Sequence, residues 1–217
     1  MPMDANAPIE VTALAWVPPF ARGRVRDLRV RWALEEIGAS YRTRLVDKRV
    51  DPRGDPAQPF TQVPVYREGG LTLFECGAIA LHIGEKDERL LPREPGARGR
   101  AITWLFAALN SIDLPLRAFG VIKRSGTDAS NNPATAMLET RLEQLSRSLG
   151  DQDWLEGTFS VGDLMMVATL RDLDMDSVKV PANLVAYITR GEARPAFQAA
   201  MAAQLADFIP DPEGVPA

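Results

Sequence analysis

The run from Gln62 to Glu85 constrains the fold of this chain more than any other segment. A short β-prone stretch is followed by the pair Gly69-Gly70, which is typical of a hairpin turn, and then by a second β-prone stretch. Apolar residues at helical spacing begin at Glu75 or Cys76. This order predicts a β-hairpin that leads directly into a helix.

The start of this helix is a candidate ligand site. The first amides of a helix have no partner within it and lie at the positive end of the helix dipole, so they attract a carboxylate. Glu75 is expected to hold an ammonium group beside them, and a site with both signs suits the head group of an amino acid. A simpler role stays open, in which Glu75 is only a favourable acid near the helix dipole.

Composition narrows the class of protein. The 217 residues are 46% hydrophobic and 25% charged, and the net charge of −4 gives no electrostatic reason to expect nucleic acid or membrane partners. No run approaches the roughly 18 consecutive apolar residues of a membrane helix, and we see no signal peptide. One cysteine excludes an internal disulfide, and one histidine, His82, argues against a metal site. We expect a cytoplasmic protein without a metal.

The order of predicted elements indicates two domains. Residues 10–86 follow the order β-α-β, an irregular segment, and then β-β-α. Residues 87–98 are rich in proline, glycine and charge and are expected to form a linker. Every strong signal in 99–217 is helical. The prediction is therefore an α/β domain over 10–86, followed by an all-α domain over 99–217.

A second motif lies in the predicted helical domain. Ser160 and Asp163 have the spacing of a capping box, and Phe159 and Leu164 have the spacing of a hydrophobic staple. Such a cap contributes about 1 kcal/mol to stability. The motif predicts a buried helix that starts directly after Ser160.

These segments, 59–86 and 154–170, resemble the glutathione transferase family, where Val-Pro, a hairpin and Glu-Ser-x-Ala-Ile at a helix start form the glutathione site. The likeness covers nearly the whole chain. It implies a thioredoxin-like N-terminal domain that binds glutathione, a C-terminal all-helical domain that supplies the substrate pocket, and a homodimer. It also implies a bacterial member of the family, whose class the sequence does not define.

The resemblance implies roles for the matched residues. Pro64 is expected to be a cis-proline that turns the Val63 backbone towards the cysteinyl amide of glutathione, and Glu75 to contact the γ-glutamyl group. Position 76 is expected to bind the γ-glutamyl carboxylate, but here Cys76 replaces the usual hydroxyl with a weaker donor. Two residues are expected to reach the glycyl end of the tripeptide: Lys48 and Gln62.

The group that activates the glutathione thiol is the main departure from the family. Its members supply Tyr, Ser or Cys after the first strand, and none of these occurs between Trp16 and Arg31. Arg22 or Arg24 could stabilise a thiolate together with backbone N–H groups, although arginines along a helix usually form a solvated face. We expect Arg29 and Arg31 to be structural.

Three functions therefore stay open. The first is a detoxifying transferase that conjugates glutathione, as co-substrate, to a small electrophile. The second is a glutathione-dependent disulfide or peroxide reductase that uses two glutathiones or the thiol of Cys76, which otherwise replaces serine without chemistry of its own. The third is a non-catalytic binding or regulatory protein, which the missing Tyr, Ser or Cys favours.

Overall fold

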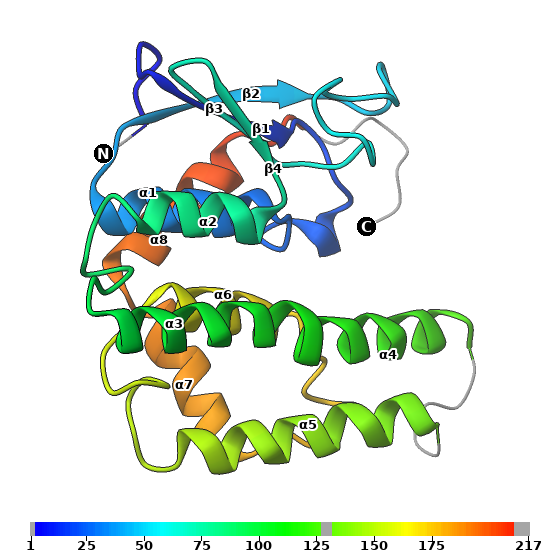
Figure 1. The fold of residues 1–217 in the computed structure, drawn as a ribbon. Coiled ribbons are helices and arrows are strands. Elements are labelled where there is room, and N and C mark those ends of the chain that lie inside the picture. The colour runs from blue at the N-terminus through cyan, green and yellow to red at the C-terminus, as the bar shows by residue number, and fades with distance from the viewer. Residues whose placement is uncertain (1–2, 127–131, 211–217) are drawn as a thin grey trace. The chain divides into compact units, whose positions relative to one another are not determined.

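The computed structural model describes residues 3–126 and 132–210 (Figure 1). Its contacts divide the chain into two compact units. The sheet unit consists of Met1–Asp87 and Arg194–Ala217, and the helical unit consists of Glu88–Ala193. A small mixed sheet followed by helices confirms the predicted fold class.

The sheet unit is built on four strands in the order β2-β1-β3-β4. Their bounds are β1 (Ile9–Leu14), β2 (Tyr41–Val46), β3 (Val65–Glu68) and β4 (Leu71–Phe74). β1 pairs in parallel with β2 and antiparallel with β3, and β3 forms a hairpin with β4. At the hairpin turn Gly69 and Gly70 have φ values of 52° and 88°, which explains why glycine occupies both positions.

Helices α1 (Asp27–Ile37) and α2 (Cys76–Gly84) pack side by side against the sheet (Figure 1). The predicted order of elements over 10–86 is confirmed, with a short 3₁₀ turn added at Pro19–Ala21. α1 ends where Gly38 takes a left-handed conformation with φ 70°.

The last helix, α8 (Pro195–Ala206), packs against α1 and belongs to the sheet unit. Arg194 pairs with Glu36 at 2.6 Å, and the ring of Phe197 meets Trp32 edge-on at 5.0 Å between centroids. The contact division therefore differs from the predicted boundary, which assigned all of 99–217 to one helical domain. The contacts that cause the difference join residues about 160 positions apart, beyond the reach of a sequence pattern.

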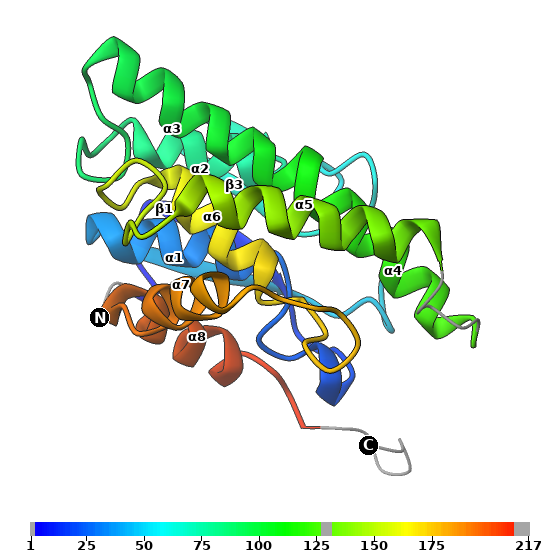
Figure 2. The ribbon, with the colours of Figure 1, turned by 90° about the horizontal axis from the view of Figure 1, so that it is seen from below.

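The helical unit contains the remaining described helices: α3 (Pro95–Ala107), a π-helical segment (Ala108–Asp113), α4 (Leu114–Arg124), α5 (Pro133–Leu149), α6 (Val161–Leu170) and α7 (Ala182–Glu192). α6 packs against α3 and α7 (Figure 2), and every one of its residues is buried. By length and composition Pro95–Arg124 could cross a membrane, but core helices of compact folds pass the same test.

The predicted capping box at the start of α6 is confirmed. Asp163 accepts a hydrogen bond from the backbone N–H of Ser160 at 2.9 Å, and the Ser160 hydroxyl accepts one from Gly162. Asp163 also accepts hydrogen bonds from the Leu155 N–H and the Tyr187 hydroxyl, at 2.9 and 2.8 Å. The capping carboxylate therefore also connects α6 to two other parts of the helical unit: the segment that precedes α6, and helix α7.

Candidate functional site

A surface pocket of the sheet unit gathers residues from the start of α1, the irregular segment before β3 and the start of α2. Its lining consists of Arg26, Gln58, Gln62, Val63, Pro64, Glu75 and Cys76. The predicted site residues of the hairpin–helix region are thus neighbours in space, although up to 14 positions separate them in the sequence. This pocket is the candidate functional site.

One edge of the pocket is the turn into β3. The Val63–Pro64 peptide bond is cis, as the family resemblance implied. The backbone N–H of the next residue, Val65, donates a hydrogen bond of 2.6 Å to the hydroxyl of Thr12 on β1, and both residues are buried. The edge is therefore fixed to the centre of the sheet.

The opposite wall is the start of α2. Glu75 is the N-cap residue, and among the described contacts its side chain makes no capping hydrogen bond. Its backbone has φ 71° and ψ 112°, a conformation that costs a residue with a side chain on the order of 1–3 kcal/mol and is concentrated at functional sites. The Glu75 side chain is exposed at the pocket. The geometry therefore presents a carboxylate next to the first amides of a helix.

Cys76 lies at the buried side of the pocket. Its thiol is free and only 2% exposed. The sulfur accepts a hydrogen bond from Nη1 of Arg29 at a distance of 3.7 Å, and Arg29 is itself buried. A positive charge therefore lies next to the position where the resemblance implied a hydroxyl.

Three predicted residues lie outside the described lining of this pocket. The Lys48 amine donates to the carbonyl of Thr61, Arg24 is exposed, and the Arg22 guanidinium lies 5.9 Å from the ring centroid of Phe208. Their expected roles stay predictions. Arg31 is structural, as expected, because it pairs with Asp27 at 2.7 Å inside the sheet unit.

Sequence reasoning did not assign Arg26 or Gln58 to the site, although both line the pocket. Arg26 belongs to the cluster of arginines around the start of α1, from which Arg22 and Arg24 were preferred as candidates. Gln58 lies in the irregular segment, is 4% exposed and accepts a hydrogen bond from the N–H of Phe60 at 2.9 Å. No periodicity marks such a residue, and the sequence carries no signal for it.

The single histidine lies elsewhere. His82 on α2 approaches Glu68 at 3.4 Å, and Glu68 also accepts hydrogen bonds from Tyr66 and Lys86. Partial burial raises the pKa of Glu68, but these three donors outweigh burial and lower it overall. Among the described residues, no group of three or more His, Cys, Asp or Glu side chains could hold a metal ion.

The lining of the pocket carries charges of both signs, as a zwitterion does. Arg26 supplies a positive charge, Glu75 a negative one, and Gln62 an exposed amide. The first N–H groups of α2 add a positive dipole end on the same wall. An α-amino acid head group has the complementary pair of charges.

Comparison with known proteins agrees with this chemistry. The family model "Glutathione S-transferase, N-terminal domain" matches residues 21–85. Residues 21–85 are therefore similar to the N-terminal domain of glutathione S-transferases. All seven lining residues of the pocket fall within this matched segment.

Three relatives extend the likeness. A glutathione S-transferase of Triticum aestivum is 25% identical over 138 residues. The aligned residues are 62% of this chain and 64% of that protein, so the match spans less than two thirds of the relative's length. A glutathione transferase structure from Pseudomonas putida, with one glutathione disulfide bound per subunit, has a TM-score of 0.75 and 20% identity and covers 91% of this chain and 92% of its own.

The third relative, described as Ure2p in complex with glutathione, has a TM-score of 0.75 and 19% identity over 92% of this chain and 95% of its own. At these identities the two structures establish the fold of the chain, which is that of glutathione transferases. Both similar structures hold a glutathione ligand: glutathione disulfide in the Pseudomonas putida protein and glutathione in Ure2p.

Proposed function

We propose that this protein binds glutathione in the pocket and conjugates its thiol to a small electrophile. The observation that carries the proposal is the joint presence of Arg26, Glu75 and the cis Val63–Pro64 bond around one pocket within the family's N-terminal domain. Glutathione is then a co-substrate: its thiol loses a proton, and the sulfur forms a bond to a carbon of the electrophile while the leaving group of that carbon, such as a halide ion, departs.

The γ-glutamyl head group matches Glu75 and the positive end of the α2 dipole. In the proposed complex the ammonium group pairs with Glu75, and the α-carboxylate lies against the first amides of α2. The backbone of Val63 is then available to the cysteinyl amide. The proposed partners of the glycyl carboxylate are Gln62, which lines the pocket, and Lys48, which lies outside the lining.

The thiolate needs a donor or a positive charge, because ionised sulfur is the nucleophile. Arg26 lines the pocket, and we propose it as the activating cation ahead of Arg22 and Arg24, which remain candidates. The exposed Arg24, two positions away, is the comparison variant, and a loss of activity confined to Arg24→Gln would assign the role to Arg24 instead.

A conjugation assay with a generic aromatic halide tests the function. Arg26→Gln should lower kcat/KM roughly tenfold or more, whereas Arg24→Gln should stay within about twofold of the wild-type protein. Absence of conjugation by a wild-type protein that binds glutathione would leave two roles: disulfide reduction, tested below, and non-catalytic binding, for which the likeness to Ure2p is support.

A second candidate is reduction of disulfides with glutathione. The Pseudomonas putida structure with bound glutathione disulfide and the thiol of Cys76 in this pocket favour it. A disulfide-reduction assay of the wild-type protein and Cys76→Ser separates the routes. Unchanged reduction in Cys76→Ser excludes the Cys76 thiol as the reducing group, and loss of reduction supports it.

The proposal includes a cytoplasmic homodimer with a role in detoxification. Sedimentation of the purified protein tests the oligomeric state, and fractionation of the cells that make it tests the location. A sedimenting mass of one chain would contradict the homodimer.

A further inference from the structure

The segment between β2 and β3, residues 47–64, carries much of the pocket. In the described structure it contains turns but neither helix nor strand. It nevertheless supplies four of the lining residues: Gln58, Gln62, Val63 and Pro64. Because irregular segments lose conformational entropy when they are ordered, something must hold this one in place if the pocket is to be ready for a ligand.

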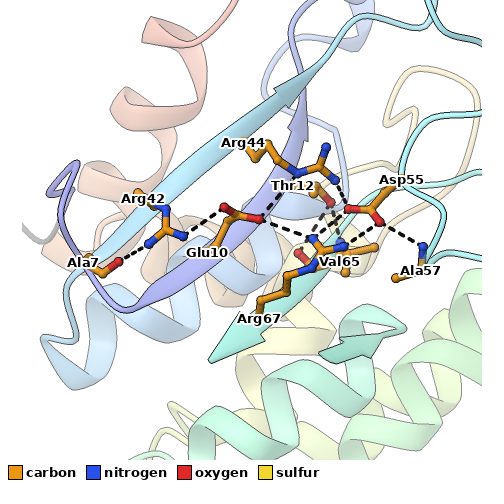
Figure 3. A network of polar contacts seen from close by, with 9 residues as sticks. All are labelled: Ala7, Glu10, Thr12, Arg42, Arg44, Asp55, Ala57, Val65 and Arg67. Carbon is orange, nitrogen blue, oxygen red and sulfur yellow. Dashed lines mark hydrogen bonds and ion pairs between the residues drawn. The ribbon is translucent and has the colours of Figure 1, made fainter. Parts of the chain in front are cut away.

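Asp55, in the middle of this segment, is attached to the sheet (Figure 3). Its carboxylate accepts two hydrogen bonds from Arg67 of β3, at 2.8 and 2.7 Å, and a further one from Arg44 of β2. The Asp55 side chain is completely buried. Two-point pairing of a guanidinium with a buried carboxylate is among the strongest polar contacts and fixes orientation as well as distance.

The two arginines are themselves held by the central strand. Glu10 of β1 lies 3.3 Å from Nη1 of Arg67 and 3.5 Å from Nε of Arg44 (Figure 3). The carboxylate of Asp55 is thus bound to a cluster supported by three neighbouring strands. The cluster is a fixed point of the sheet unit.

A chain of hydrogen bonds leads from Asp55 to the pocket. Its carboxylate accepts from the N–H of Ala57 at 2.9 Å, and its carbonyl accepts from the N–H of Gln58 at 3.0 Å. The carbonyl of Gln58 accepts from the N–H of Thr61 at 3.1 Å, and Lys48 donates to the carbonyl of Thr61. Gln62 follows directly, so each turn between the anchor and the pocket is bonded.

We propose that Asp55 is a positioning residue for the ligand: it holds Gln58, Gln62 and the turn before Pro64 in their binding geometry without lining the described pocket itself. This inference rests on the proposed glutathione site. If the anchor is released, the segment samples other conformations. The apparent dissociation constant then rises as the inverse of the fraction of molecules that remain competent.

The test is calorimetric titration of reduced glutathione into the wild-type protein and Asp55→Asn, which keeps the size of the side chain and removes its charge. The matched control is Asp51→Asn, in the same segment, whose 3.2 Å ion pair with Arg53 is exposed. Asp55→Asn should raise Kd roughly tenfold or more at unchanged stoichiometry. Asp51→Asn should stay within about twofold of wild type. Partial unfolding would instead lower the stoichiometry.

Hydrogen exchange gives a readout that needs no ligand. In Asp55→Asn the amides of residues 57–62 should exchange roughly tenfold faster or more, while those of α6 keep the wild-type rate. If Asp55→Asn fails to fold, Arg67→Gln takes its place, because it removes the two-point partner and leaves Arg44.

Each outcome is decisive. Wild-type affinity in a folded Asp55→Asn overturns the inference, as does unchanged exchange of residues 57–62. If the wild-type protein binds no glutathione, the proposed function fails on its own. The exchange rates then still support or contradict Asp55 as the anchor of the segment.

Discussion

Nη1 of Arg29 lies 3.7 Å from the sulfur of Cys76, at the first turn of α2. Both side chains are buried, and the thiol occupies a position that borders the pocket. The hydrogen-bonding power of residue 76 can therefore be varied without changing the exposed surface of the protein.

Cys76→Ser should bind reduced glutathione roughly threefold to tenfold more tightly than the wild-type protein, because a hydroxyl donates to a carboxylate better than a thiol does. Calorimetry measures the change. Cys76→Ala is the control and should bind no better than wild type. Weaker binding by Cys76→Ser would mean that the thiol, and not a hydroxyl, is the better partner at this site.

The backbone of Glu75 separates binding from stability. Because φ is 71°, Glu75→Gly should relieve strain, and its stability should change by no more than about 1 kcal/mol. Loss of the carboxylate should nevertheless raise the Kd for glutathione roughly tenfold or more. Urea unfolding and calorimetry give the two values.

Glu75→Gln decides between the two roles of this residue. It keeps the strained backbone and removes the charge, so a ligand contact predicts weak binding with little change in stability. If Glu75 acts only on the helix dipole, Glu75→Gln should bind glutathione with wild-type affinity and lose about 0.3–1 kcal/mol of unfolding free energy.

Glycines of the helical unit allow a matched test of close helix packing. A methyl group at Gly162 of α6 would lie 2.7 Å from Cβ of Trp104 and 2.8 Å from the carbonyl oxygen of Ala101, both on α3. Gly162→Ala should therefore lose about 1–3 kcal/mol of unfolding free energy. Gly99→Ala on α3, where no atom lies within 4 Å, should gain about 0.5–1 kcal/mol. Equal stabilities in urea unfolding would contradict the packing.

Tyr187 predicts a specific loss of stability in alkali. Burial, and then the carboxylate of Asp163, raise the pKa of Tyr187 well above its ordinary value of 10. The folded protein keeps the phenol proton that the unfolded chain loses above pH 10, so stability falls as pH rises past 10. The slope should approach about 1.4 kcal/mol per pH unit. The unfolding free energy of Tyr187→Phe should not show this additional fall with pH. If the unfolding free energies of the two proteins run parallel from pH 9 to 11, the predicted role of Tyr187 is wrong.

Local patterns predicted one element of each unit. Gly69-Gly70 marked the hairpin of the sheet unit, and the spacing of Ser160 and Asp163 marked the start of α6 in the helical unit. Each of these signals depends on neighbours a few positions away. Such neighbours are read directly from the sequence.

The features that the sequence did not reveal depend on contacts between distant positions. Asp55 is charged and lies in an irregular segment, which usually indicates an exposed residue, yet Arg67 buries it from another element. In the same way, no local pattern in the sequence of α8 assigns it to the sheet unit, where Arg194 pairs with Glu36. Such pairings follow from the three-dimensional arrangement of the elements.

The central claim is that the γ-glutamyl head group binds between Glu75 and the start of α2. Calorimetric titration of the wild-type protein with reduced glutathione, and in parallel with the dipeptide Cys-Gly, tests it most directly. We predict saturable binding of one glutathione per chain and a Kd for Cys-Gly at least about 100-fold higher, because the dipeptide lacks the γ-glutamyl group that the two charged partners recognise. Equal affinity for the two ligands, or no heat of binding with glutathione, would contradict the account.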